Sequence, residues 1–334
     1  MSGGRDPRDV LFDSGEAALP LPACDHYAGT PALMAKSLAL QRELGPVFDV
    51  TFDCEDGAPV GGEAGHAELV ARMLLSAENH FDRVGARVHP VGHPAFADDV
   101  ATIVGQAGSR LAYLMLPKVE SVADVARAAA LVDAASAGVE RRVPLHALIE
   151  THGALRDVEA IAAHPRIESL SFGLMDFVSA HRGAIPAEAM SADGQFAHAL
   201  VVRAKLAIAA ACHGHAKTPS HNVVTEFGDT SMVARAATRA ARELGYTRMW
   251  SIHPAQIRPI VAAFQPHAEE VDAALAILDA AARADWAPIQ TGQVLHDRAS
   301  YRYFWHVLVR ASRASGGLPA DARERYFGAR SGVP

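Results

Sequence analysis

The stretch LHALIETHGALRD, residues 145–157, contains the two halves of a single βα unit. It is apolar from Leu145 to Ile149, as is usual for a strand of a parallel sheet that is buried on both faces. Glu150 and Thr151 follow directly, and a segment that can form a helix comes next. A buried strand that ends in a carboxylate raises the question of what that carboxylate does.

The same pattern recurs along the chain. Short apolar runs alternate with longer segments of helical periodicity, such as SVADVARAAALVDAA and SMVARAATRAARELG, which is typical of βα units around a parallel sheet. The number of units predicts a (β/α)8 TIM barrel over residues 18–265, with an open doubly wound sheet as the alternative. The expected strands are residues 18–24, 47–55, 83–90, 111–118, 143–150, 167–176, 216–222 and 248–254. The run at 216–222 has few apolar residues, so a loop there is nearly as good an interpretation.

Two segments flank the expected barrel. Residues 1–17 are interpreted as an N-terminal arm. Residues 266–334 contain EEVDAALAILDAAARADW, which has the pattern of an amphipathic helix, and TGQVLHDRASYRYFWHVLVRAS, which reads as a turn into a second helix. This C-terminal helical segment is therefore interpreted as an appendage to the barrel.

Composition narrows the class of protein. A formal charge of -7 and a pI near 6.2 argue against a general nucleic-acid binder, which normally carries a basic surface. Cys24, Cys54 and Cys212 are far apart and form no CxxC pair, so neither a disulfide framework nor a zinc site is expected. The N-terminus has no apolar core of signal-peptide length, and no apolar run approaches a membrane span. We therefore expect a cytoplasmic protein with no membrane partner.

Polar side chains gather at the ends of the expected strands. In a barrel of this kind, these ends and the loops after them form the active-site face. Although strand ends are exposed in any case, their recurrence at the same end of most strands predicts a shared site. The residues concerned are Asp53, Glu55, Asp56, Arg87, His89, Lys118, Glu120, Glu150, Asp176 and His253.

Glu150 and Asp176 end neighbouring strands in this scheme. Two hard oxygen ligands on adjacent strand ends suit Mg²⁺, which keeps several waters and binds through one or two carboxylates plus substrate oxygens. The alternative is that each carboxylate caps the helix that follows it or pairs with an arginine. We favour the metal site.

Arg87 and His253 each allow two interpretations. The guanidinium of Arg87 can grip a carboxylate by two parallel hydrogen bonds, and it can equally form an ion pair with Glu55 or Asp56 on the adjacent strand. His253, in SIHP, is a candidate for substrate binding, although a buried histidine with only a structural role is as common.

Six motifs together resemble those of a known family. They occur in the order seen in the citrate lyase β-subunit-like branch of the HpcH/HpaI aldolase/citrate lyase superfamily, over most of residues 47–264. Each motif is weak by itself, and their shared order carries the resemblance. The motifs are FDCEDGA (52–58), ARVHP (86–90), LPKVES (116–121), LIET (148–151), SFGLMDF (171–177) and SIHPAQI (251–257).

The resemblance implies a Mg²⁺-dependent TIM-barrel lyase. Such an enzyme cleaves a carbon–carbon bond in a short β-hydroxyacyl thioester, usually of coenzyme A, such as a citryl, malyl or citramalyl thioester, through a metal-stabilised enolate. Carried over to this chain, the resemblance makes Glu150 and Asp176 the metal ligands. It makes Arg87 the holder of the oxo-acid carboxylate, and it places Glu55 and Asp56 against metal-bound waters.

Further site residues follow from the same resemblance. His89, Lys118 and His253 lie in the matching motifs and are expected to contact substrate. Asp297, in GQVLHDRA, matches a lid aspartate that reaches a neighbouring subunit's site, where it would transfer a proton as general base or acid. A homotrimer or homohexamer is then expected. The alternative for Asp297 is a helix N-terminal acid stabilised by the helix dipole.

The chain also departs from the family pattern. In LPACDHYAGT, Asp25 and His26 stand where a substrate-contacting arginine is expected, and His89 replaces an asparagine. These changes leave the metal ligands intact but bear on the acyl partner. Two alternatives therefore stay open: a metal-dependent aldolase that acts on free 2-oxo-hydroxy acids through pyruvate enolate, and a catalytically silent barrel that serves as a binding subunit.

Overall fold

The computed structural model describes residues 6–12, 21–58, 60–137, 141–313 and 317–328. Within these ranges the chain divides into two compact units. The barrel unit comprises residues 22–264, and the C-terminal unit comprises residues 265 onward together with the described part of the first 21 residues. Each unit is described by itself.

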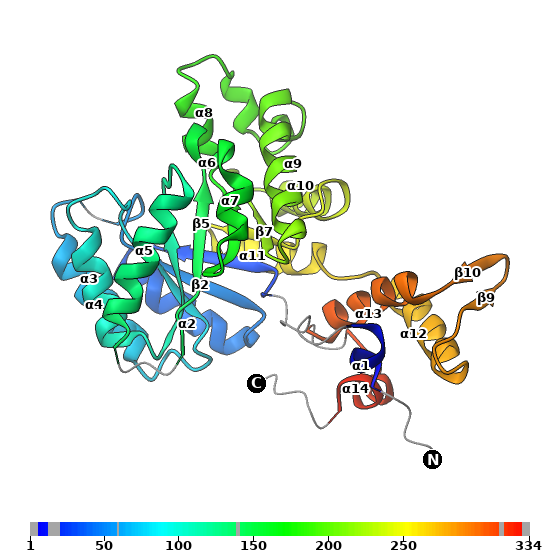
Figure 1. Cartoon of the computed structure of the whole chain (residues 1–334). Coiled ribbons are helices and arrows are strands. Elements are labelled where there is room, and N and C mark those ends of the chain that lie inside the picture. Colours follow the sequence, from blue (N-terminus) through cyan, green and yellow to red (C-terminus); the bar gives the residue numbers. More distant parts are fainter. Residues whose placement is uncertain (1–5, 13–20, 59, 138–140, 314–316, 329–334) are drawn as a thin grey trace. The chain divides into compact units, whose positions relative to one another are not determined.

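The barrel unit is built on eight parallel strands that close in chain order, because each strand bonds to the next and β8 bonds to β1 (Figure 1). The predicted (β/α)8 barrel is confirmed, including the strand with few apolar residues near position 220. The strands are β1 (Cys24–Ala28), β2 (Phe48–Asp53), β3 (Val84–Arg87), β4 (Leu111–Leu116), β5 (Leu145–Ile149), β6 (Ile167–Phe172), β7 (Thr218–His221) and β8 (Arg248–Ser251).

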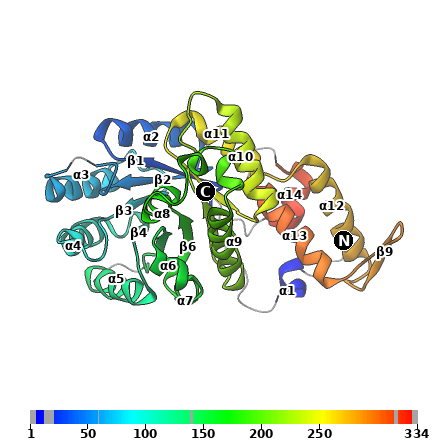
Figure 2. The same cartoon turned by 90° about the horizontal axis from the view of Figure 1, so that it is seen from above.

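Helices surround these strands, as Figure 2 shows from above. Several begin with a side-chain cap; Thr151, for example, accepts a hydrogen bond from the Ala154 N–H at the start of α6. The helices of the barrel unit are α2 (Pro31–Leu44), α3 (Glu63–Leu75), α4 (Phe96–Ala107), α5 (Val122–Ala135), α6 (His152–Arg156), α7 (Val158–Ala163), α8 (Leu174–Ala180), α9 (Ala199–Gly214), α10 (Thr230–Glu243) and α11 (Pro254–Ala263), with two 3₁₀ turns at Ala187–Met190 and Gly194–Phe196.

The two faces of each strand pack in different apolar clusters. Outward side chains, such as Phe48 and Val50, join the helices in one apolar core. On the inner face, Tyr27, Met115, Leu148 and Trp250 form a separate apolar cluster inside the barrel. Most of them lie in the second half of their strands, so this cluster supports the strand ends where the site residues stand.

The first strand differs from the prediction. It was expected at 18–24, but β1 is Cys24–Ala28, and residues 18–20 lie outside the described ranges. The apolar run that suggested the earlier position contains two prolines, which cannot donate to a strand ladder. Asp25 and His26, which stand where the family pattern has a substrate-contacting arginine, are both buried residues of β1.

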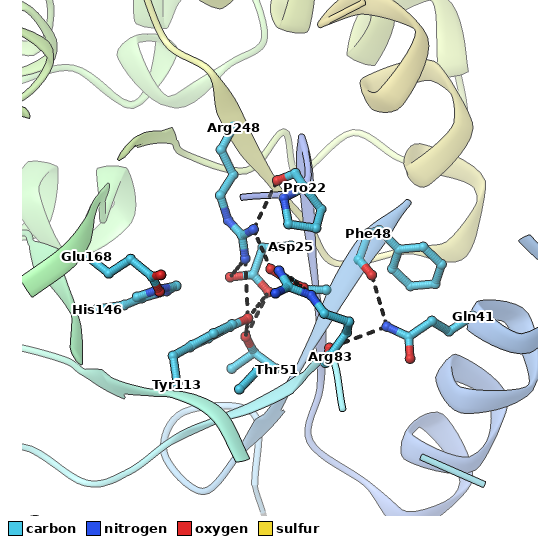
Figure 3. Close-up of polar contacts among 12 residues, drawn as sticks. Pro22, Asp25, Gln41, Phe48, Thr51, Arg83, Tyr113, His146, Glu168 and Arg248 are labelled. Carbon is cyan, nitrogen blue, oxygen red and sulfur yellow. Dashed lines mark hydrogen bonds and ion pairs between the residues drawn. The ribbon is translucent and has the colours of Figure 1, made fainter. Parts of the chain in front are cut away.

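Asp25 belongs to a buried charge network near the starts of the strands (Figure 3). Arg248 on β8 donates to Asp49 on β2 at 2.5 Å and lies 3.2 Å from Asp25 on β1. Asp25 also accepts hydrogen bonds from the hydroxyls of Thr51, at 2.7 Å, and Tyr113, at 2.9 Å. Buried charges are tolerated when they are paired and hydrogen-bonded. The network therefore explains how a polar sequence can form the closing strands of the barrel.

The C-terminal unit is helical. Helix α12 (Ala268–Arg283) and α13 (Arg298–Ser312) pack together, and a two-stranded hairpin, β9 (Ile289–Thr291) and β10 (Val294–His296), connects them. α1 (Pro7–Leu11) and α14 (Ala320–Phe327) join their apolar core. Across the described ranges, no helix is both long and apolar enough to cross a membrane.

Candidate active site

A buried ion pair forms the floor of the site. Arg87 ends β3 and donates from Nε to Asp53 Oδ1 at 2.8 Å and from Nη2 to Asp53 Oδ2 at 2.5 Å. Its Nη1 lies 3.0 Å from Glu55 Oε2. Burial would lower the pKa of Arg87, but the charge and hydrogen bonds of Asp53 outweigh it and raise the pKa. The structural ion pair considered for Arg87 is therefore present with Glu55, and its bidentate partner is Asp53.

Lys118 connects the acidic loop after β2 to the other side of the site. Its Nζ donates to Glu55 Oε1 and lies 3.2 Å from Asp56 Oδ2 and 3.9 Å from Asp176 Oδ1. Partial burial works against the charged ammonium, but the hydrogen bond and charge of Glu55 raise the pKa of Lys118 above its ordinary value. Glu55 and Asp56 thus bind a lysine in this structure, while their expected contact with metal-bound waters stays a prediction.

The backbone at Lys118 also takes part. Its φ of 48° lies in the left-handed region, which is uncommon for a residue with a side chain and tends to occur at functional sites. In this conformation the Lys118 N–H donates to Glu150 Oε1 at 2.7 Å. The same residue therefore orients Glu150 through its backbone and neutralises Glu55 through its side chain.

Glu150 and Asp176 lie close enough to repel each other. Glu150 directly follows β5, whereas Asp176 is in the first turn of α8; the prediction that Asp176 closes strand six is wrong, because β6 ends at Phe172. Burial, together with the negative charge of Asp176, raises the pKa of Glu150 to about 7. A burial penalty and a neighbouring like charge both favour the neutral acid, and a cation bound between the two carboxylates would favour their charged forms.

The donor set fits a divalent ion that needs few protein ligands. In the described part of the chain, no group of three His, Cys, Asp or Glu side chains is placed to hold a metal. Among the described residues, however, Glu150 Oε2 has no hydrogen-bond partner, and Asp176 is partly exposed. Two oxygen ligands with open positions match the habits of Mg²⁺, which completes its shell with waters and substrate oxygens. Carboxylates also outnumber cations here, with Asp53, Glu55, Asp56, Glu150 and Asp176 facing Arg87 and Lys118.

The two histidines predicted to bind substrate have different surroundings. His89, two residues after Arg87, is buried, and its Nδ1 lies 2.7 Å from Asp99 Oδ2 on α4. His253 is exposed and is not at a strand end, because β8 stops at Ser251. It caps α11 by accepting the Ala255 N–H and stacks on Phe227 with ring centroids 5.2 Å apart. Substrate binding by either histidine stays a prediction.

Asp297 belongs to the C-terminal unit. It caps α13, where its Oδ1 accepts the N–H groups of Ala299 at 2.9 Å and Ser300 at 3.3 Å. The helix-terminal role considered from the sequence is thus present within one chain. The side chain is exposed at the end of the hairpin, so it is also accessible to a second molecule.

Two site residues were not given a role from the sequence. Asp53 was noted as a polar strand end, but its bidentate bond to Arg87 depends on the register that places β2 beside β3. Asp99 lies ten positions after His89, in the first turn of α4. Its signal in the sequence was weak, because an acid in the first turn of a helix is common without any further function.

Comparisons with known proteins identify the family to which the chain belongs. A profile of the HpcH/HpaI aldolase/citrate lyase family matches residues 45–254, which contain every strand except β1. An L-malyl-CoA/beta-methylmalyl-CoA lyase of Cereibacter sphaeroides is 30% identical over 280 residues, covering 79% of this chain and 86% of the relative.

Solved structures show the same fold. A citrate lyase from Burkholderia xenovorans LB400 is 56% identical with a TM-score of 0.84, covering 96% of this chain and 99% of that one. A CitE protein of Mycobacterium tuberculosis, crystallised with magnesium, acetoacetate and coenzyme A, has a TM-score of 0.68 at 21% identity and covers 88% of this chain and 99% of its own. With a closed barrel, acidic and cationic side chains at its strand ends and a family match over most of its length, this chain belongs to the HpcH/HpaI aldolase/citrate lyase family and is a carbon–carbon lyase.

Proposed function

We propose that this protein is a Mg²⁺-dependent lyase that cleaves, or in reverse forms, the carbon–carbon bond of a β-hydroxyacyl thioester of coenzyme A. Citryl, malyl and citramalyl thioesters are the substrates we expect. The observation that carries the proposal is the close pair of carboxylates Glu150 and Asp176 in a site where five carboxylates face only Lys118 and Arg87. The 30% identity to a malyl-CoA lyase supports the thioester class.

Glu150 and Asp176 would hold the ion. When bound, Mg²⁺ supplies a Lewis acid and a template for the substrate oxygens, which the developing enolate needs. The protein contributes the orientation of the ligands, because the Lys118 N–H fixes one oxygen of Glu150 and leaves Oε2 for the ion.

Arg87 would hold the carboxylate of the oxo-acid portion. Asp53 and Glu55 together contact each of the three guanidinium nitrogens once. A guanidinium has five N–H donors, so donors remain for substrate. The acidic partners fix the plane of the guanidinium before substrate arrives, which lowers the cost of ordering it. Asp297, supplied by a neighbouring molecule, would exchange the proton at the enolate carbon.

The test is a substrate panel. Purified protein with and without Mg²⁺ is given citryl-, malyl- and citramalyl-CoA beside free hydroxy-oxo acids, and release of the 2-oxo acid is followed. We expect Mg²⁺-dependent turnover of at least one thioester and none of the free acids. Turnover of the free acids alone would instead support an aldolase that uses pyruvate enolate. Mg²⁺ binding without turnover of any compound would support a silent binding subunit.

A further inference from the structure

His89 is held in one orientation by three contacts at the active-site end of β3. Its Nδ1 lies 2.7 Å from Asp99 Oδ2, and its backbone N–H donates to the same oxygen at 3.0 Å. The ring of His93 stacks on one face, with centroids 4.4 Å apart and an interplanar angle of 14°. A side chain that is already fixed in this way loses little conformational entropy when it acts on a substrate.

The contacts leave one ring nitrogen available. Because the carboxylate of Asp99 can only accept, the Nδ1 of neutral His89 carries the hydrogen and Nε2 carries the lone pair. Nε2 has no partner in the described ranges and is not among the enclosed atoms that lack one. His89 therefore offers a basic atom with solvent access in an otherwise buried residue.

His89 follows Arg87, which forms the buried ion pair of the site, by two residues along the chain. Val88 continues the pairing with β4 through its N–H to Met115 O at 3.2 Å, so His89 follows Arg87 by two extended residues, about 7 Å along the strand direction and on the same side. Burial raises the pKa of the Cys54 thiol, and the charges of Asp99 and Asp53 raise it further. Cys54 is thus close to both the carboxylate that holds His89 and the one that holds Arg87.

We propose that His89 is the general base of the cleavage step and that Asp99 is its positioning residue. This inference rests on the proposed function. Nε2 of His89 accepts the proton of the substrate β-hydroxyl, the C–O bond becomes a carbonyl, and the carbon–carbon bond breaks with its electron pair moving into the thioester enolate. A second group, Asp297 in the proposed function, then protonates the enolate carbon, and His89 returns its proton to water.

Two proton transfers at different atoms can be measured separately. Cleavage of the carbon–carbon bond needs both His89 at the hydroxyl and the group at the enolate carbon. Exchange of the acetyl-CoA methyl protons for deuterium in D₂O needs only the group at the enolate carbon. The experiment measures both rates with Mg²⁺ present: 2-oxo acid release from the panel's best thioester, and deuterium uptake into acetyl-CoA alone.

The substitution His89→Asn isolates the proposed atom, because an asparagine amide can keep the hydrogen bond to Asp99 from the place of Nδ1 and has nothing at Nε2. We expect the ratio of cleavage to exchange to fall by at least about a hundredfold, the usual size of a general-base contribution. In Asp297→Asn both rates should fall together. Asp99→Asn should lower kcat with little change in KM, because it disturbs the tautomer of His89.

His146 supplies the matched control. It is also buried, it also lies within 2.9 Å of a carboxylate oxygen, that of Glu168, and it also stacks on a ring, that of Tyr113. It stands in the first half of β5, away from the strand ends, so His146→Asn should keep the wild-type ratio.

Three outcomes would overturn the inference. If His89→Asn keeps its cleavage rate within tenfold of wild type, or loses cleavage and exchange equally, His89 is not the base at the hydroxyl. If the wild-type protein neither cleaves the carbon–carbon bond of any thioester nor exchanges the methyl protons, the proposed function is wrong. The role of His89, which depends on that function, is then wrong as well.

Discussion

At the scale of single residues, the site is defined by how its charges are paired. Arg87 and Lys118 are both fixed by carboxylates, whereas Glu150 and Asp176 face each other with only the Lys118 ammonium nearby, 3.9 Å from Asp176 Oδ1. Because like charges at short range raise the cost of ionisation, the pair is unfavourable unless a cation joins it. The unfavourable pair is the strongest local reason to expect a metal here.

Glu150→Gln should abolish Mg²⁺-dependent turnover. The amide keeps the shape of Glu150 and can still accept from the Lys118 N–H, but it loses the negative charge that the ion requires. We expect kcat to fall roughly a thousandfold or more, as several kcal/mol of transition-state stabilisation are lost. Titration calorimetry should show weaker Mg²⁺ binding. The control is Glu78→Gln, which changes an exposed carboxylate that pairs with Arg42 in the segment before β3. Metal-dependent turnover retained in Glu150→Gln would contradict the assignment of Glu150 as a metal ligand.

At the scale of elements, barrel closure depends on polar contacts as well as on apolar packing. The strands β8, β1 and β2 meet through Arg248, Asp25 and Asp49, all of them fully buried. A purely apolar layer could also close a barrel, and a buried ion pair contributes little net stability compared with such a layer. Removal of Arg248 is different, because Asp25 would then stay buried without a cation and Asp49 would keep only its ion pair with Arg83.

Arg248→Met should therefore destabilise the fold by about 3–5 kcal/mol. The substitution preserves much of the side-chain volume and leaves Asp25 and Asp49 short of their shared cation. Urea denaturation measured by circular dichroism gives the change in free energy of unfolding. The control is Arg258→Met, which breaks an exposed ion pair with Glu43 and should cost less than about 1 kcal/mol. Equal costs for the two variants would contradict the role of the network.

The junction of β1 and β8 should also respond to acid. Burial, with a smaller effect from the charge of His253, lowers the pKa of His26 to about 4 from an ordinary value of 6.5. A base with a lowered pKa is neutral in the folded state, so its stabilisation is complete above pH 6.5 and is lost as the pH falls from 6.5 through 4. The shift corresponds to a loss on the order of 3 kcal/mol.

His26→Asn removes this titration. Free energies of unfolding measured between pH 7 and pH 4 should fall less steeply for the variant than for wild type, whatever its stability at pH 7. If the two curves run parallel, protonation of His26 does not contribute to acid sensitivity.

At the scale of the whole molecule, the residues that we propose as catalytic are divided between two units. The barrel unit holds Glu150, Asp176 and Arg87, and the C-terminal unit holds Asp297 directly after a hairpin whose residues Val294 and Leu295 are also exposed. Exposed apolar side chains beside a polar candidate are typical of a contact surface. We propose that they meet a second copy of the chain in a homotrimer or homohexamer.

Mixing two inactive variants tests this arrangement. If Asp297 acts in the site of a neighbouring molecule, co-expressed Glu150→Gln and Asp297→Asn chains form some sites in which both residues are intact, about a quarter in a random mixture. Activity should return in the mixed oligomer, measured as Mg²⁺-dependent thioester cleavage. If Asp297 acts within its own chain, every site in the mixture stays defective and activity does not return.

The sequence by itself determined the architecture. Alternating apolar runs and helical segments specify a closed parallel barrel because each strand must bury both faces and each helix one. Seven of the eight strands therefore overlap their predicted positions well. The first strand did not overlap well, because the apolar run at 18–24 contains prolines, which cannot donate to a strand ladder. The more polar residues that follow it form β1 instead. The polar residues near the strand ends also predicted that Glu55, Arg87, Lys118, Glu150 and Asp176 lie together, since parallel strands bring their carboxyl ends to one face. His253 instead caps α11.

Only the tertiary structure decided how those side chains pair. Arg87 binds Asp53 because the β2–β3 register places them side by side, and His89 binds Asp99 because α4 packs back on β3. Asp25 and His26 are buried rather than at the mouth because partners from β8, β2 and β4 satisfy them. Hydrogen bonds and ion pairs act over a few ångströms between residues far apart in sequence. Periodicity reveals which face a side chain occupies, but only the register of the closed barrel identifies its partner.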